Sequence, residues 1–154
     1  MSKGIFSALE YVENLIELTT PKSDVHHGFV AVNRGDGLTA SLENRPHSNR
    51  YFELELEGLA QDDGQAGISG RKRSRVNLRV RYDIPSDQGY LMRLINEDVS
   101  YLIDTLKGPN YDTINTGIVS IIPLTPLLEP VLDAQGDALA FMLSLAFDLL
   151  FLEA

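Results

Sequence analysis

The sequence predicts an α+β fold: a single, mostly antiparallel sheet with two amphipathic helices packed on one face. Three observations lead to this prediction. Residues 52–57 and 75–82 alternate between apolar and polar side chains, and all the polar ones except Asn77 are charged, as in half-buried strands. Residues 88–106 repeat apolar side chains at helical spacing. Residues 138–152 alternate large side chains with mostly small or polar ones, and a period of two over that length indicates a long strand.

Composition limits the classes of protein to consider. The chain has 154 residues, of which 44% are hydrophobic and 23% charged, so we expect one globular domain over residues 1–154. Its formal net charge of −9 disfavours a dedicated nucleic-acid site, because phosphates require a positive surface. The absence of cysteine excludes disulfides and thiolate metal sites. The longest apolar segment has about 15 residues, short of the ~20 that span a bilayer, so no membrane contact is expected.

The N-terminal half is expected to contain a helix and three strands. Residues 3–18 repeat apolar side chains at helical spacing, and the helix should end before Pro21, because the residue before proline avoids the helical region. The apolar stripe consists of Ile5, Phe6, Leu9, Val12 and Ile16. A short strand at 28–33 follows, and then strands at 50–57 and 75–84.

The C-terminal half begins with the second helix, at 88–106, which ends at Gly108-Pro109. Its stripe consists of Leu91, Leu94, Ile95, Val99, Leu102, Ile103 and Leu106. Residues 118–122 are apolar and β-branched, which favours a strand. Prolines at 123, 126 and 130 should prevent long regular structure after it. A turn at 135–137 then leads into the final strand.

The two charged strands should pair antiparallel, with glutamates opposite arginines on the solvent face. The residues concerned are Glu53, Glu55 and Glu57 on one strand and Arg75, Arg79 and Arg81 on the other. Three carboxylates on one face could serve as a general acid–base set. We favour solvated ion pairs, each worth roughly 0.2–1 kcal/mol, whose main effect is to fix the register and discourage edge-to-edge aggregation.

The linker at 58–74 is glycine-rich and carries the basic run Arg71-Lys72-Arg73. We expect a loop that is mobile in an isolated subunit and ordered against a neighbour. No basic residue follows Lys107, so the chain is polarised in charge, which suits head-to-tail self-association. The candidate subunit-interface residues are Arg71, Lys72, Arg73, Arg75, Glu53, Glu55 and Glu57.

No catalytic motif is present, so we expect no enzyme, no cofactor and no metal site. The adjacent His26 and His27 would point to opposite faces of a strand and could not easily ligate one ion. The alternative from a different class is a small enzyme whose site is assembled from distant residues, such as His26, His47 and Asp83.

The order of elements resembles that of the tail terminator (tail-completion) proteins of long-tailed bacteriophages. The likeness rests on residues 49–55, on 75–85 and on the helix that follows. It departs at the proline-rich segment 123–130 and at the long final strand.

The resemblance implies a structural virion protein without catalytic residues. It would form a ring, expected to be a hexamer, on the end of the tail tube, stop tube polymerisation and join the tube to the head connector. Its partners would be its own copies, the tail tube protein and head-connector proteins. It would be assembled in the host cytoplasm and reside in the tail or neck of the virion. The loop 58–74 would face neighbouring subunits. A neck, connector or tube-like virion subunit is the alternative within the same class.

Overall fold

The computed structural model describes residues 4–18, 29–32, 50–58, 61–62, 71–83, 88–107, 111 and 116–152. Within them the chain forms two helices and one sheet of seven strands, which confirms the predicted α+β class. The elements are α1 (Ile5–Glu17), β1 (Phe29–Ala31), β2 (Arg50–Leu56), β3 (Gln61–Asp62), β4 (Arg71–Asp83), α2 (Gln88–Lys107), β5 (Ile118–Pro123), β6 (Leu127–Leu132) and β7 (Ala138–Leu152).

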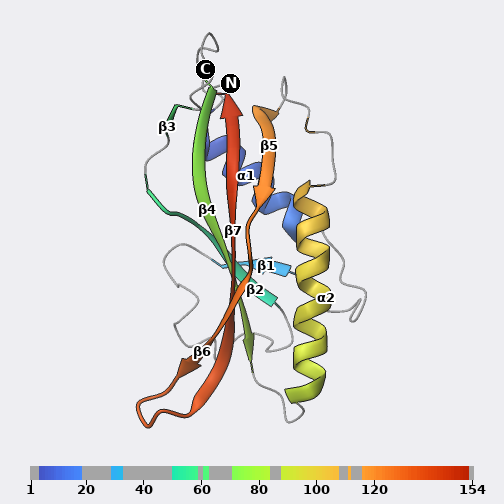
Figure 1. The fold of residues 1–154 in the computed structure, drawn as a ribbon, viewed down its shortest axis with the longest axis vertical. Coiled ribbons are helices and arrows are strands. Elements are labelled where there is room, and N and C mark those ends of the chain that lie inside the picture. Colours follow the sequence, from blue (N-terminus) through green and yellow to red (C-terminus); the bar gives the residue numbers. More distant parts are fainter. Residues whose placement is uncertain are drawn as a thin grey trace.

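The centre of the sheet is the antiparallel pair of β4 and β7, which stay in register from Arg71 opposite Leu152 to Asp83 opposite Ala140. The strand order is β1-β2-β4-β7-β5, with β3 beside β4 and β6 beside β7. The one parallel pair in this sheet is β1 with β2. Figure 1 shows β4 and β7 running along the long axis of the molecule, and the hairpin of β6 and β7 projecting at one end.

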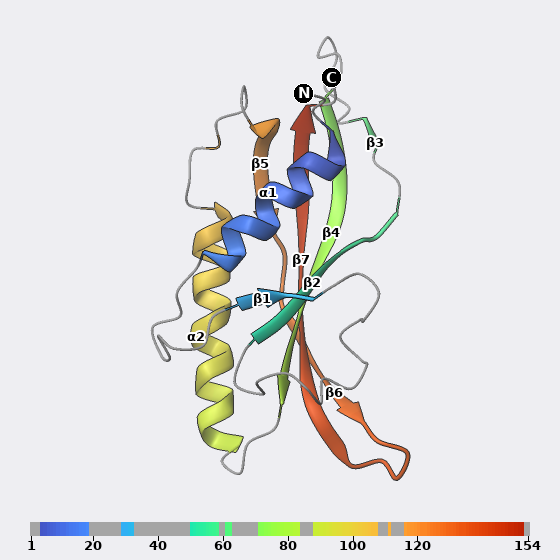
Figure 2. The same ribbon diagram turned by 180° about the vertical axis from the view of Figure 1, so that it is seen from behind.

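Both helices cover the same face of the sheet, and the core lies between them and the central strands. Figure 2 shows α1 crossing the sheet and α2 lying alongside it. Alternate residues of the two long strands point into this core, as the period-two pattern predicts. Fully buried residues are Val76, Leu78 and Val80 of β4, Leu145, Phe147 and Leu149 of β7, Val12 and Ile16 of α1, and Leu102 and Leu106 of α2.

A buried ionic group also lies on the helix-covered face. Arg50 of β2 donates from Nε to Asp98 Oδ2 of α2 at 2.7 Å, and the Tyr82 hydroxyl of β4 donates to the same oxygen at 2.8 Å. None of the three residues is more than 4% exposed. Burial raises the pKa of Asp98, and the hydrogen bonds from Arg50 and Tyr82 only partly offset it. This trio ties α2 to both β2 and β4.

The strand β4 begins at Arg71 and not at Arg75 as predicted. Arg71, Lys72 and Arg73 therefore lie in a strand and not in a loop. The physical reason is non-local pairing, because the start of β4 lies opposite the end of β7 and beside β3. The expected loop at 58–74 is also interrupted by β3 at Gln61–Asp62. Residues 59–60 and 63–70 lie outside the described residues, so the mobility expected there stays a prediction.

The prolines limit regular structure as expected, since β5 ends at Pro123 and β6 has 6 residues, but β6 itself was not predicted. Pro130 lies inside β6, which pairs only with β7 among the described strands, and an edge strand tolerates a residue without an N–H. The prediction that Phe6 is buried was wrong. Phe6 is 70% exposed although it belongs to the predicted stripe of α1. The buried line of α1 is Ala8, Val12 and Ile16, and Phe6 lies about 200° around the helix from Ala8.

Replacing Leu102 by alanine should lower the free energy of unfolding by about 2–5 kcal/mol, because the side chain is fully buried and its removal leaves a cavity. Urea denaturation measures the change. Leu132→Ala is the matched control, since Leu132 is 55% exposed and its loss should stay within about 0.5 kcal/mol. Equal losses in the two variants would contradict the assigned core.

Asp98→Ala should be as costly as a large core deletion, at about 3–5 kcal/mol, because it removes the counterion of the buried Arg50 guanidinium. Tyr82→Phe removes one hydrogen bond and should cost about 1 kcal/mol. Thermal and chemical unfolding of both variants, with the exposed Asp104→Ala as control, test this order. The prediction fails if Asp98→Ala and Asp104→Ala unfold alike.

Candidate interaction surface

The charged residues singled out in the sequence gather mainly on the face of the sheet opposite the helices. Side chains alternate along β4, so Arg71, Arg73 and Arg75 lie on this open face while the intervening residues point to the core. Glu53 and Glu55 share this face, because they lie opposite Arg79 and Asn77 in the register. Lys72 alternates with these arginines and therefore lies on the core side of β4, where it is half-buried at the start of the strand.

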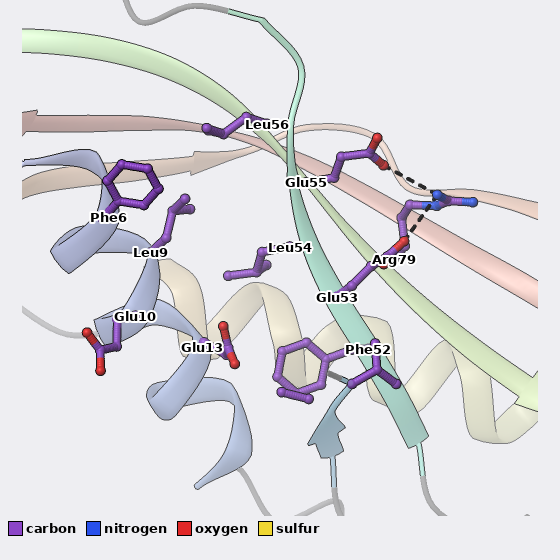
Figure 3. A pocket seen from close by; sticks show the side chains of 12 residues that line it. Phe6, Leu9, Glu10, Glu13, Phe52, Glu53, Leu54, Glu55, Leu56 and Arg79 are labelled. Carbon is purple, nitrogen blue, oxygen red and sulfur yellow. Dashed lines mark hydrogen bonds and ion pairs between the residues drawn. The ribbon is translucent and has the colours of Figure 1, made fainter. Parts of the chain in front are cut away.

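Arg79 joins the two glutamates of β2 into one cluster. Its Nη1 donates to Glu53 Oε1 at 3.2 Å and to Glu55 Oε2 at 3.3 Å, as the dashed lines in Figure 3 mark. The glutamate side chains are 26% and 57% exposed, so water screens the pairs and each contributes little stability. The predicted pairing of glutamates with an arginine is confirmed here.

Arg75 has a different partner from the one expected. Glu57 lies opposite Arg75 as expected: its N–H donates to the Arg75 carbonyl at 3.0 Å, and, after the larger effect of Asp148, its charge is a minor contribution to the raised pKa of Arg75. The Arg75 guanidinium instead donates from Nε to Asp148 Oδ1 of β7 at 3.0 Å. The predicted placement of a glutamate opposite Arg75 is confirmed, but the hydrogen-bonded ion pair of its guanidinium is with Asp148 of β7 and not with a glutamate of β2.

Asp148 is the centre of this second cluster. Its Oδ2 also accepts from Arg73 Nη2 at 2.6 Å, and the aspartate is only 3% exposed. Burial alone would raise the pKa of Asp148, but the hydrogen bonds and charges of Arg75 and Arg73 outweigh it and hold the pKa below its usual value. Sequence analysis did not assign Asp148 to the site, although it is the one charged residue in the apolar run 138–152.

The β6–β7 hairpin forms a third surface. It exposes three large apolar side chains, those of Leu127, Leu132 and Leu139, by 61%, 55% and 51%. Its tip is a defined turn, in which Asp133 Oδ1 accepts the N–H groups of Gln135 and Asp137 at 2.9 Å each. Gly136 takes a φ of 87°, which favours glycine.

A hollow lies between α1 and the edge of β2, as Figure 3 shows. Phe6 and Leu9 of α1 and Leu54 and Leu56 of β2 give it an apolar floor. Glutamates rim it from both elements, and Arg79 lies at one side. These side chains suit contact with a partner that carries apolar and basic groups. The glutamates of the rim are Glu10, Glu13, Glu53 and Glu55.

No protein-family model and no curated protein matches this chain. Within the described residues, no helix is long and apolar enough to cross a membrane. The described part of the chain also contains no group of three or more histidine, aspartate or glutamate side chains placed to hold a metal ion. His26 and His47 lie outside the described residues, as does the side chain of Asp83, so the hypothesis of an assembled catalytic triplet stays a prediction.

Asp148 should make folding stability depend on pH in the acid range. Its pKa is lower in the folded state than in the unfolded chain, so its contribution is present above about pH 4 and is lost as the pH falls through the folded-state value. Asp148→Asn should therefore melt below the wild type at neutral pH and lose less stability on acidification. The measurement is the melting temperature between about pH 7 and pH 3. The exposed Asp104→Asn serves as control, and identical profiles for both variants would contradict the assignment.

Proposed function

We propose that this chain is a structural protein of a bacteriophage virion, which assembles into a ring at the end of the tail tube, terminates the tube and joins it to the head connector. The resemblance in the order of elements suggests this function. The structural observation that supports it most is the opposite charge of the two ends of the sheet.

The basic end is the start of β4. Arg71, Lys72 and Arg73 follow one another there, opposite the last residues of β7. Arg73 is half-exposed although it pairs with Asp148. Among the described residues of this region, the four basic residues at 71, 72, 73 and 75 face two carboxylates, because Asp148 pairs with Arg73 and Arg75 and Asp62 of β3 lies opposite Lys72.

The acidic end is the β6–β7 hairpin, at the opposite end of the long axis (Figure 1). Glu129 and Asp137 are exposed there, beside the three exposed leucines. Charge complementarity between the hairpin of one copy and the basic end of the next would orient the contact. Burial of the leucines would supply affinity, at up to about 1.5–3 kcal/mol for each side chain fully removed from water.

A contact in which one patch of a copy meets a different patch of the next copy is heterologous. Repeated contacts of this kind close into a ring when the rotations between successive copies add up to a full turn. If the rotation does not close, the same contact produces a filament. A terminator requires the ring, whereas a tube-like subunit requires the filament. The shape of the assembly therefore separates the proposal from its nearest alternative.

The proposal predicts a closed ring, expected to be a hexamer, in native mass spectrometry and negative-stain images of the concentrated protein at low salt. Glu129→Lys with Asp137→Lys should weaken the ring at least about tenfold in dissociation constant, because the hairpin then repels the basic end. Arg71→Glu with Lys72→Glu should do the same from the other side. The four changes together should restore assembly, since both charges are reversed.

These variants leave Arg73 and its pair with buried Asp148 intact. Because Arg71 and Lys72 are half-buried, circular dichroism and thermal melting must first show that each variant is folded. Salt at about 0.5 M should weaken the wild-type ring, because it screens exposed charges. A protein that stays monomeric at every concentration would refute the ring. Open-ended filaments would instead support the tube-like subunit. Failure of the combined variant to recover would show that the two ends do not meet.

A further inference from the structure

Two rows of side chains with different chemistry lie on the open face, one on each side of β7. Arg75 of β4 and Ile122 of β5 both lie opposite Asp148 of β7, from its two sides. Residues opposite one another in a sheet point to the same face, so the three side chains form one line across it. The same order recurs four residues earlier along β7, at Arg79, Ser144 and Leu127. Figure 1 shows β4, β7 and β5 side by side, with α1 behind them.

The first row contains two guanidiniums that a buried carboxylate holds in place, and we call Arg73 and Arg75 the guanidinium pair. Asp148 accepts from Arg73 Nη2 and from Arg75 Nε. Glu57 also attracts Arg75, but less strongly than Asp148 does. Both arginine side chains are still 49% exposed, and their Nη1 groups take no part in the bonds to Asp148. The pair can therefore donate to a carboxylate of a partner with little further loss of side-chain entropy.

The second row is apolar. Ile122 is 46% exposed and Leu127 is 61% exposed, and we call them the apolar pair. They lie opposite residues of β7 that are four positions apart, so roughly 13 Å separates them along the strand direction. A free phosphate or a nucleic-acid backbone would leave both side chains in water. A protein with carboxylates beside apolar side chains would satisfy both rows, because it would also bury this apolar surface.

The spacing of the rows fits an α-helix better than a strand. The rows are two strand spacings apart, or roughly 10 Å, which is close to the diameter of a helix. Eight residues of helix rise about 12 Å, so positions i and i+8 of one apolar stripe match the separation of the apolar pair. A strand directs its side chains alternately toward and away from the sheet, so it cannot present two kinds of side chain on separate flanks.

We propose that the open face binds an amphipathic helix of another protein. The helix lies along β7, with carboxylates on the flank that meets the guanidinium pair and apolar side chains on the flank that meets the apolar pair. Charge complementarity selects this helix over a basic one, since a carboxylate accepts from the Nη1 groups whereas a lysine is repelled by them.

The ion pairs of the other arginine on this face orient the helix. Arg79 already pairs with Glu53 at 3.2 Å and with Glu55 at 3.3 Å. A further carboxylate beside Arg79 would face these two glutamates, so the acidic residues of the helix lie at the Asp148 end. The binding requires no ring, because one subunit contains the whole site. Leu127 also belongs to the hairpin that the proposed ring uses, so a separate test of the helix site leaves it unchanged.

A fluorescein-labelled, alanine-based helical peptide of about 20 residues, read by fluorescence anisotropy at about 0.15 M salt, tests the proposal. It carries leucines at i, i+4 and i+8 on one flank and a pair of glutamates on the adjacent flank near one end. One control peptide has lysines in place of the glutamates, and another has a central proline. The glutamate peptide should bind at least about tenfold more tightly than either control. Equal binding of either control would overturn the proposal, because apolar adhesion would explain the first result and an extended partner the second.

Variants of the protein locate the site. Ile122→Ser and Arg75→Gln should each weaken binding of the glutamate peptide by about fivefold or more. The matched controls lie on α2, on the other side of the sheet: Met92→Ser removes an apolar side chain of similar exposure, 41%, and Arg93→Gln removes an exposed guanidinium. Both controls should leave binding unchanged, and equal effects of test and control variants would refute the site.

Thermal melting must first show that each variant is folded. Arg75→Gln removes one partner of buried Asp148, and if it does not fold, Ile122→Ser against Met92→Ser decides the test. If Ile122→Ser abolishes self-association of the protein alone and leaves peptide binding intact, the occupant is a second copy and the proposed partner is wrong.

Discussion

The position of α2 on the sheet depends on one carboxylate, that of Asp98. Apolar burial holds the helix against the sheet but has no direction, whereas hydrogen bonds fix position and angle. Asp98 Oδ2 accepts from both Arg50 and Tyr82, while its Oδ1 is buried without a hydrogen-bond partner. A buried ion pair with an unsatisfied oxygen is a poor source of net stability. We infer that the trio serves specificity, since it locks β2, β4 and α2 in one arrangement.

The second constraint is the β4–β7 pair, whose two faces carry different chemistry. One face is an apolar core, while the other carries the arginines of β4 and the buried carboxylate of Asp148. Because the two strands are long and antiparallel, the start of β4 and the β6–β7 hairpin must lie at opposite ends of the sheet. The charge separation between the ends therefore follows from strand length and register.

Much of this fold could be predicted from the sequence, because long periodic segments report which face they bury. α2 and β7 were placed correctly, since their patterns extend over many residues. The periodic pattern failed to predict strand boundaries where pairing with a strand distant in the sequence determines them. Arg71 and Lys72 join a strand because β7 continues beside them, and Pro130 is tolerated because β6 is an edge. Asp98 falls in line with Leu91, Ile95 and Leu102, and a charged residue inside an apolar stripe was the signal of a buried partner.

The ends of the sheet and the β1–β2 pair lie in different parts of the subunit, and this separation has a structural cause. The ends of the sheet are set by β4 and β7, whereas β1 pairs, within the described residues, with the first three residues of β2. Arg50, the first of those residues, is anchored to α2 through Asp98, so the trio also fixes where the covered part of β2 begins.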